Sequence, residues 1–186
     1  MFTGIIEALG SVADLQLRGG EWRMNIHSTA LDFGDVILGD SIAINGVCLT
    51  VTKLGNASFE VDVSNETMEH TTLLAFTKSS KVNLEKALTP NKRLGGHIVS
   101  GHVDGVGELI AMRSDGASIR MDFRAPKELA KYIAQKGSIC IDGTSLTVNT
   151  VNGYLELLMQ GESAAEEQQD SAGKLTKSLL AENGFI

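Results

Sequence analysis

The stretch LGDSIAINGVCLTVT, residues 38–52, recurs in altered form as QKGSICIDGTSLTVN, residues 135–149. The starting points at 38 and 135 define a shift of 97 positions, and the same shift places Gly10 on Gly107. A register that holds over separate segments without slipping indicates a duplicated module. Cys48 of the first copy falls on Ser145 of the second, so the copies differ chemically at one shared position.

Each copy has the pattern of a small β-structure. β-Branched residues, partial alternation and turn glycines at Gly46 and Gly143 are typical of short paired strands. Further strands are predicted at residues 26–31, 59–64, 82–88 and 119–125. Because closure into a barrel leaves no exposed strand edge, we expect an all-β chain with two tandem, homologous small barrels.

Helical patterns are few. Residues 125–137 have a proline in the first turn, apolar residues at helical spacing and a glycine at the end, which predicts a helix. Residues 64–70, SNETMEH, contain a partial capping box and predict a short helix or turn. The polar, turn-rich residues 89–96 mark the expected boundary between a first domain, residues 1–90, and a second, residues 97–153.

The repeat breaks after Val151. The first module continues with residues 58–86, and the sequence that follows Val151 shows no clear equivalent. A barrel that loses part of its ladder leaves main-chain donors and acceptors without partners. We therefore expect the second barrel to be incomplete, with a deletion of roughly thirty residues that would carry two or three strands.

The remaining residues, 154–186, form a third expected segment. YLELLMQ, residues 154–160, predicts the end of an amphipathic helix. Residues 161–173 carry four acids and no base, which is typical of a solvated linker. Residues 174–185 predict a short terminal helix that ends at Asn183.

Composition limits the class of protein. With 42% hydrophobic and 21% charged residues the chain can bury a core, and its net charge of −7 argues against a non-specific nucleic-acid surface. No run approaches the roughly 18 apolar residues of a membrane span, and MFTGIIEALG lacks the basic start of a signal peptide. We expect a cytoplasmic protein without nucleic-acid or membrane partners, in which Cys48 and Cys140 are reduced thiols.

Two histidines, His97 and His102, lie five positions apart. No other metal-ligating residue types converge on them in the sequence, so we expect no metal site. The neighbouring glycines do not fit a dinucleotide-binding fingerprint. His102 takes the repeat position of Ile5, and it is either a buried structural histidine or a general acid/base near neutral pH.

Other candidate residues lie in the repeated strands. Cys48 is either a packing residue or a nucleophile, and a nucleophilic thiolate would need a base or a cation beside it. Thr50 and Thr147 share one repeat position. They either fill the strand or donate hydrogen bonds to a polar heterocycle.

Five segments together resemble the riboflavin synthase family: MFTGIIE, GDSIAINGVCLTVT, NLEKAL, GGHIVSGHVDGVGE and KGSICIDGTSLTVN. The match runs nearly continuously from residue 1 to about residue 152, and the tail from Tyr154 resembles the family's C-terminal helix, resumed after a gap. The resemblance implies two antiparallel, six-stranded Greek-key barrels, a short C-terminal helix and a homotrimer. It also implies the last step of riboflavin biosynthesis. Two molecules of 6,7-dimethyl-8-ribityllumazine exchange a four-carbon unit, giving riboflavin and 5-amino-6-ribitylaminouracil without a metal or added cofactor.

The duplication suits this reaction. Each module would bind one lumazine, and holding two like substrates together removes much of the barrier. In the family, the productive site joins the N-terminal barrel of one subunit to the C-terminal barrel of its neighbour. The resemblance places substrate contacts at Gly4, Ile5, Ile6, Cys48, Leu49, Thr50, Asp62, Val63, Ser64, Asn65, Glu66, Thr67, Gly101, His102, Val103, Lys136, Ser145, Leu146 and Thr147. The residues expected beside the reacting rings are His102, Ser41, Cys48 and Thr50, and the choice of base stays open.

The deletion bears on activity. It would remove the second module's counterpart of residues 62–67 and a carboxylate that follows the VNLE-type strand in the family. We expect a large loss of turnover, with one ligand still bound by the first barrel.

The alternative is a non-catalytic lumazine- or flavin-binding protein of the same fold. Retained polar residues such as Ser41 and His102 favour the enzyme, whereas the truncation favours the binder. A small-barrel oligonucleotide binder is disfavoured by the net charge and the few aromatic residues.

Overall fold

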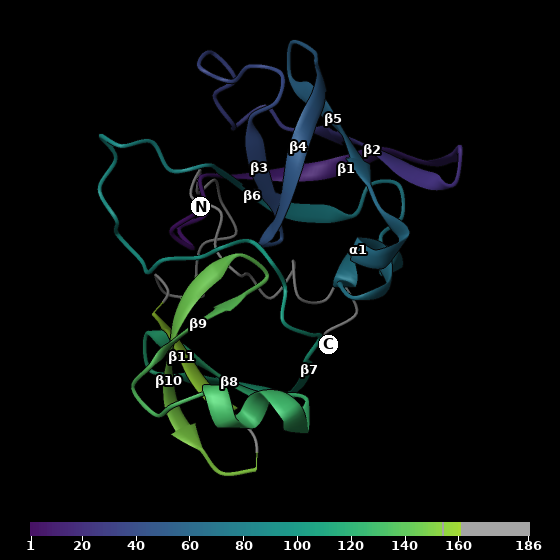
Figure 1. Ribbon diagram of the computed structural model, residues 1–186. Coiled ribbons are helices and arrows are strands. Elements are labelled where there is room, and N and C mark those ends of the chain that lie inside the picture. Colours follow the sequence, from purple (N-terminus) through teal and green to yellow (C-terminus); the bar gives the residue numbers. More distant parts are fainter. Residues whose placement is uncertain (154, 161–186) are drawn as a thin grey trace.

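The computed structural model describes residues 1–153 and 155–160. Over these residues the chain is mostly β, as the sequence predicts, and Figure 1 shows its two modules one above the other. The first module contains β1 (Ala8–Arg18), β2 (Glu21–His27), β3 (Ser41–Ile44), β4 (Val47–Leu54), β5 (Ser58–Val63), α1 (Asn65–Glu69), η1 (Thr72–Ala75) and β6 (Lys81–Lys86). The second contains β7 (Glu108–Asp115), β8 (Ser118–Arg124), η2 (Lys127–Tyr132), β9 (Ser138–Ile141), β10 (Thr144–Val151) and β11 (Leu155–Gln160).

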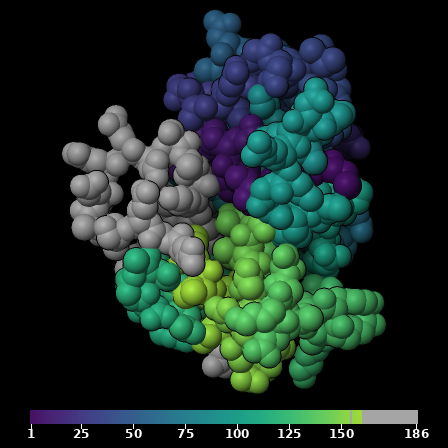
Figure 2. Space-filling view, turned by 90° about the vertical axis from the view of Figure 1, so that its left-hand side faces the viewer, coloured from purple at the N-terminus to yellow at the C-terminus, as the bar shows by residue number. Residues whose placement is uncertain are grey.

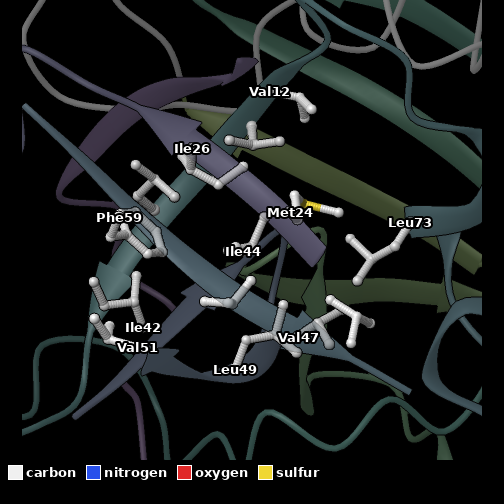
Figure 3. Packing of buried hydrophobic residues seen from close by; sticks show 14 of the residues in the cluster. Val12, Met24, Ile26, Ile42, Ile44, Val47, Leu49, Val51, Phe59 and Leu73 are labelled. Carbon is white, nitrogen blue, oxygen red and sulfur yellow. The ribbon is translucent and has the colours of Figure 1, made fainter. Parts of the chain in front are cut away.

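The first module is a closed antiparallel barrel with the strand order β1-β2-β5-β4-β3-β6. β6 closes it by pairing with β1 on one side and β3 on the other. Successive side chains of a strand face opposite ways, so alternate residues such as Met24 and Ile26 fill the interior. Leu73 of η1 packs into the same core (Figure 3).

The strands of the second module repeat those of the first. After a shift of 97 residues, from Glu21 to Ser118 for example, β8, β9, β10 and β11 have the same bounds as β2, β3, β4 and β5. The irregularity of β1 between Val12 and Asp14 recurs in β7 between Leu109 and Ala111. The sheet order β7-β8-β11-β10-β9 is therefore the barrel order without its last strand. Among the described residues no strand takes the place of β6, and the sheet stays open between β7 and β9.

Two expectations about the end of the second module are wrong. Leu155–Gln160 is a strand paired with β8 and β10, whereas the sequence predicts the end of a helix. A short apolar run fits both periods. Here Leu155, Leu157 and Met159 are buried in alternation, because the facing edges of β8 and β10 need a partner. The counterpart of β5 is thus present, and the described chain lacks one strand of the barrel rather than two or three. The expected linker and terminal helix within 161–186 lie outside the described residues.

The short helices follow the sequence in part. α1 begins after Ser64, whose hydroxyl accepts a hydrogen bond from the Thr67 amide at 3.1 Å, so the partial capping box does cap a helix. The helix predicted over residues 125–137 is only the 3-10 helix η2. The strand predicted at residues 26–31 ends at His27. None of the helices that the structure describes is long and apolar enough to cross a membrane.

The two modules meet along an approximate two-fold axis. Phe2 and Val99 occupy equivalent repeat positions and pair through two main-chain hydrogen bonds of 2.8 and 3.0 Å. Gly46 and Gly143, in the β3–β4 and β9–β10 turns, face each other, and a Cβ on either would lie 2.8 or 2.9 Å from the other's amide nitrogen. Figure 2 shows the N-terminal residues, in purple, between the modules. This symmetry brings equivalent residues of the two copies together.

Candidate functional site

Four predicted site residues meet at this axis. The Cys48 amide donates to the Gly101 carbonyl at 2.9 Å, and the Ser145 amide donates to the Gly4 carbonyl at 2.7 Å. The two hydrogen bonds are equivalents, because Cys48 corresponds to Ser145 and Gly4 corresponds to Gly101. Each module therefore offers a strand residue and a glycine, and each strand residue is held by the glycine of the other module.

The glycines at this contact are required by space and by backbone conformation. Gly4 has φ +74° and Gly101 has φ +79°, a left-handed region that side chains disfavour. A Cβ on Gly4 would lie 2.8 Å from the Cβ of Ser145, and one on Gly101 would lie 2.6 Å from the Cβ of Cys48. The close approach of the modules depends on both glycines.

A buried carboxylate supports Gly4. Glu85 of β6 is 2% exposed. It accepts hydrogen bonds from the amides of Thr3, at 2.7 Å, and Gly4, at 3.0 Å, and from the Thr3 hydroxyl at 2.6 Å. Glu85 was not predicted as a site residue, although its alternation with Leu84 and Val82 in a predicted strand was the available signal.

A second contact was also missed. His97 Nδ1 lies 2.7 Å from Ser145 Oγ, and the His97 amide donates to the Thr3 carbonyl at 3.0 Å. Burial lowers the pKa of His97 below its usual 6.5, so the imidazole is neutral at pH 7. A neutral imidazole beside a hydroxyl can accept its proton, which is the arrangement of an activated nucleophile or a proton relay. The sequence presented His97 only as an unsuitable metal ligand.

The two thiols lie beside the same apolar cluster. Both are free, and both pack against the small apolar cluster around Phe2, Ala43 and Val99. Burial raises the pKa of Cys140 to about 12, so this residue remains a protonated thiol. The packing role considered for Cys48 agrees with its place in the same cluster.

Other predicted residues lie on the outer faces of the two modules. Ser41 and Thr50 are opposite each other on β3 and β4, and Thr50 is exposed. Ile5 is 49% exposed and Val103 is 40% exposed, and His102 beside it is exposed as well. The equivalent positions Ile5 and His102 thus face outward and are available to a ligand or another chain.

Most polar side chains of residues 62–67, which run from β5 into α1, form hydrogen bonds or ion pairs within the first module. Arg23 binds Asp62 with two hydrogen bonds, of 2.7 and 3.0 Å, and holds the pKa of that carboxyl below its usual range. Ser64 caps α1 and also lies 3.0 Å from the Thr67 hydroxyl. Glu66 pairs with His70 at 3.1 Å. Asn65 donates to the Gly20 carbonyl, and Val63 is buried.

The remaining predicted residues are either buried in the cores or exposed on the second module. Ile6, Leu49 and Leu146 are buried in the cores. Lys136 has φ +63° at the repeat position of Gly39, and its ammonium group donates to the Asn149 side chain at 3.2 Å. Thr147 is exposed on β10, opposite Ser138.

A cavity of about 380 Å³ lies in the second module, against the β3–β4 turn of the first. Its wall includes Gly101, His102 and Val103 but none of the other residues predicted from the resemblance. Within the part of the chain that the structure describes, no cluster of three or more His, Cys, Asp or Glu residues could hold a metal ion.

Comparison with known proteins identifies the class. The family model described as Lumazine binding domain matches residues 3–87 and 100–168, once for each module. Solved structures of LumP with 6,7-dimethyl-8-(1'-D-ribityl) lumazine and with riboflavin superpose with a TM-score of 0.76, at 21% identity over 86% of both chains. The fold is therefore that of tandem lumazine-binding domains.

Relatives define the family within that class. The chain is 48% identical to riboflavin synthase from Photobacterium phosphoreum over 221 positions, which cover 100% of both proteins. It is 45% identical to riboflavin synthase of Bacillus subtilis over 80% of this chain and 68% of that protein, and 43% identical to that of Saccharomyces cerevisiae over 82% and 67%. The chain belongs to the riboflavin synthase family. The first alignment spans 221 positions against 186 residues here, so 35 positions of the relative have no counterpart in this chain.

Proposed function

We propose that the chain is a riboflavin synthase. Two molecules of 6,7-dimethyl-8-ribityllumazine react, one donates a four-carbon unit to the other, and the products are riboflavin and 5-amino-6-ribitylaminouracil. The observation that carries the proposal is the pair of equivalent hydrogen bonds, Cys48 to Gly101 and Ser145 to Gly4. They show that one chain carries the same loop twice, and we propose that each copy binds one lumazine. The identity of 43–48% to riboflavin synthases supports it.

The chemistry needs a proton removed from the C7 methyl of one lumazine and a nucleophile added at C7 of the other. His102, Ser41, Cys48 and Thr50 remain the residues proposed beside the reacting rings. The His97–Ser145 pair adds a base that is neutral at pH 7 and already hydrogen-bonded to a hydroxyl. No residue in these roles requires a metal or an added cofactor.

We propose that the productive site forms between chains in a homotrimer. Ile5 and His102 occupy equivalent positions and are both exposed, so the two loops do not enclose a ligand within one chain. The first module of one copy facing the second module of another would bring these loops together around two substrates. The free thiols Cys48 and Cys140 agree with a reducing, cytoplasmic setting.

The open second module weakens this site. Glu85 fixes the Gly4 loop in the first module, and no described residue fixes the Gly101 loop in the same way. We expect turnover well below that of a relative with both barrels closed, since misplacement of one substrate by about 1 Å can cost 100-fold in rate.

The test is product analysis after purified chain is incubated with the lumazine. Riboflavin and 5-amino-6-ribitylaminouracil in equal amounts, in excess of one per chain, support the proposal. The second candidate, a non-catalytic lumazine- or flavin-binding protein, is favoured by the open second module and predicts bound lumazine with neither product.

A further inference from the structure

The cavity of the second module lies where the sixth strand of the first module runs. β6 pairs with residues 8–11 of β1 and residues 42–44 of β3. The repeat equivalents are residues 105–108 and 139–141, and most of them line the cavity. Among the described residues, the cavity therefore lies between β7 and β9, the two edge strands of the open sheet, and neither has a partner on that side.

The absence of a partner is visible in both edges. Ile42 and Ile44 of β3 are 0% exposed, whereas the equivalent Ile139 and Ile141 of β9 are only half-buried. β1 begins at Ala8, whereas β7 begins at Glu108 instead of the equivalent residue 105. Residues 105–107 stay outside the ladder, and Ile139 and Ile141 of β9 stay partly exposed, where their equivalents in the first module are covered by β6.

The polar groups around the cavity are the repeat equivalents of the groups that bind β6 in the first module. In the first module, the Glu85 carboxylate accepts the amides of Thr3 and Gly4. The equivalent amides are those of Ser100 and Gly101, and neither has an acceptor in the part of the chain that the structure describes. A carboxylate at the same place in the hollow would satisfy both donors.

A second polar contact that β6 makes in the first module has no counterpart among the described residues of the second. Asn45 exchanges two hydrogen bonds with the main chain of Asn83, of 2.7 and 2.9 Å. Its equivalent, Asp142, lines the cavity and makes no such pair among the described residues. The Asn45 side chain is 4% exposed and lines the same cavity, and its Nδ2 has no acceptor there. A buried donor without a partner is unfavourable, so the cavity favours a ligand with polar main-chain groups over a purely apolar one.

We propose that the second module is a strand-acceptor groove, which binds an extended peptide segment in trans, antiparallel to β7 and β9. The occupant has the chemistry of β6: apolar residues on either side of an asparagine, followed by a glutamate. Open strand edges bind added strands through main-chain hydrogen bonds, while side-chain contacts select the sequence. The first module shows the completed state, because there Val82, Asn83, Leu84 and Glu85 are all buried.

The test uses a labelled peptide with the sequence of residues 80–88, SKVNLEKAL, titrated into the full chain and followed by fluorescence anisotropy. Saturable binding of one peptide per chain is expected. A peptide with Glu85→Gln should bind at least about tenfold more weakly, because it loses the charge-assisted bonds to the Ser100 and Gly101 amides. A scrambled peptide of the same composition should not bind.

Amide hydrogen exchange locates the peptide. Bound peptide should slow exchange at Ser100, Gly101, Asp104 and Asp142 and leave Cys48, already hydrogen-bonded, unchanged. The proposal is overturned by absent or sequence-independent binding, or by binding that leaves these amides unprotected. It is equally overturned if the four amides are protected before peptide is added, or if the chain dimerises through the groove and excludes the peptide.

Discussion

The hydrogen bond between His97 Nδ1 and Ser145 Oγ, 2.7 Å long, joins a residue of the segment between the modules to a strand of the second module. It brings a titratable group against a hydroxyl at the contact between the modules. Ser145 occupies the position of Cys48, so the two copies carry a hydroxyl and a thiol at equivalent places, and the hydroxyl has an imidazole beside it. This asymmetry suits a reaction in which two identical substrates play different roles.

If this pair acts as a unit, its variants will be non-additive. We expect His97→Gln and Ser145→Ala each to lower kcat at least about tenfold, and the double variant to be no slower than the slower single variant. His27→Gln, on the exposed end of β2, is the matched control and should keep normal kcat. Independent, multiplying losses in the double variant would show that the pair does not work together.

A second prediction at the residue scale concerns Asp142. Desolvation raises its pKa from 3.8 to about 7 in the folded chain. As pH rises from about 4 to 7, the unfolded chain loses this proton first, so folding becomes less favourable until the folded group ionises as well. The contribution of Asp142 is therefore most favourable at low pH and least favourable above pH 7.

Asp142→Asn should remove that pH dependence, since the first module has Asn45 at this position and asparagine accepts the φ of +45°. We expect the variant to be more stable than the parent by about 1 to 3 kcal/mol at pH 8 and equally stable near pH 4, measured by urea unfolding. Asp14→Asn, on an exposed part of β1, should change stability by less than about 0.5 kcal/mol at either pH. A constant difference across the pH range would contradict the assignment.

Among the elements, β6 decides the difference between the modules. Its contacts protect the amides of Thr3, Gly4, Glu7 and Asn45, each of which donates a hydrogen bond to β6 at 2.7 to 3.0 Å. We expect these amides to exchange at least about tenfold more slowly than their equivalents Ser100, Gly101, Asp104 and Asp142. The amides of Cys48 and Ser145 are matched internal controls, because both are bonded and should be protected alike. Equal protection in the two sets would mean that the second module is closed in solution.

The sequence predicted the repeat, the strand-rich fold and the open second module, because a fixed register of 97 positions needs no tertiary information. It misread Leu155–Gln160, since six apolar-rich residues fit a helix or a strand and the neighbouring edges of β8 and β10 decide between them. Glu85 and His97 were missed for a related reason. Their roles depend on partners about 50 to 80 positions away, which no local pattern reveals.

At the scale of the whole molecule, the internal two-fold axis sets what one chain can do. Phe2 pairs with Val99 and Gly46 faces Gly143, so equivalent backbone segments of the two modules are in direct contact at this axis. The loops carrying Ile5 and His102, which we propose bind the substrates, are exposed. A second copy is then needed to bring one loop of each kind together, which is why we propose that catalysis depends on assembly.

The proposed reaction of two lumazines is tested most directly by the initial rate of riboflavin formation as a function of 6,7-dimethyl-8-ribityllumazine concentration. Since two lumazines meet in each turnover, we expect the rate to rise about fourfold for each doubling of substrate at low concentration. We also expect an equal yield of 5-amino-6-ribitylaminouracil. Lumazine bound at one molecule per chain, with no riboflavin at any concentration, would rule out the synthase reaction and identify the chain as a binding protein.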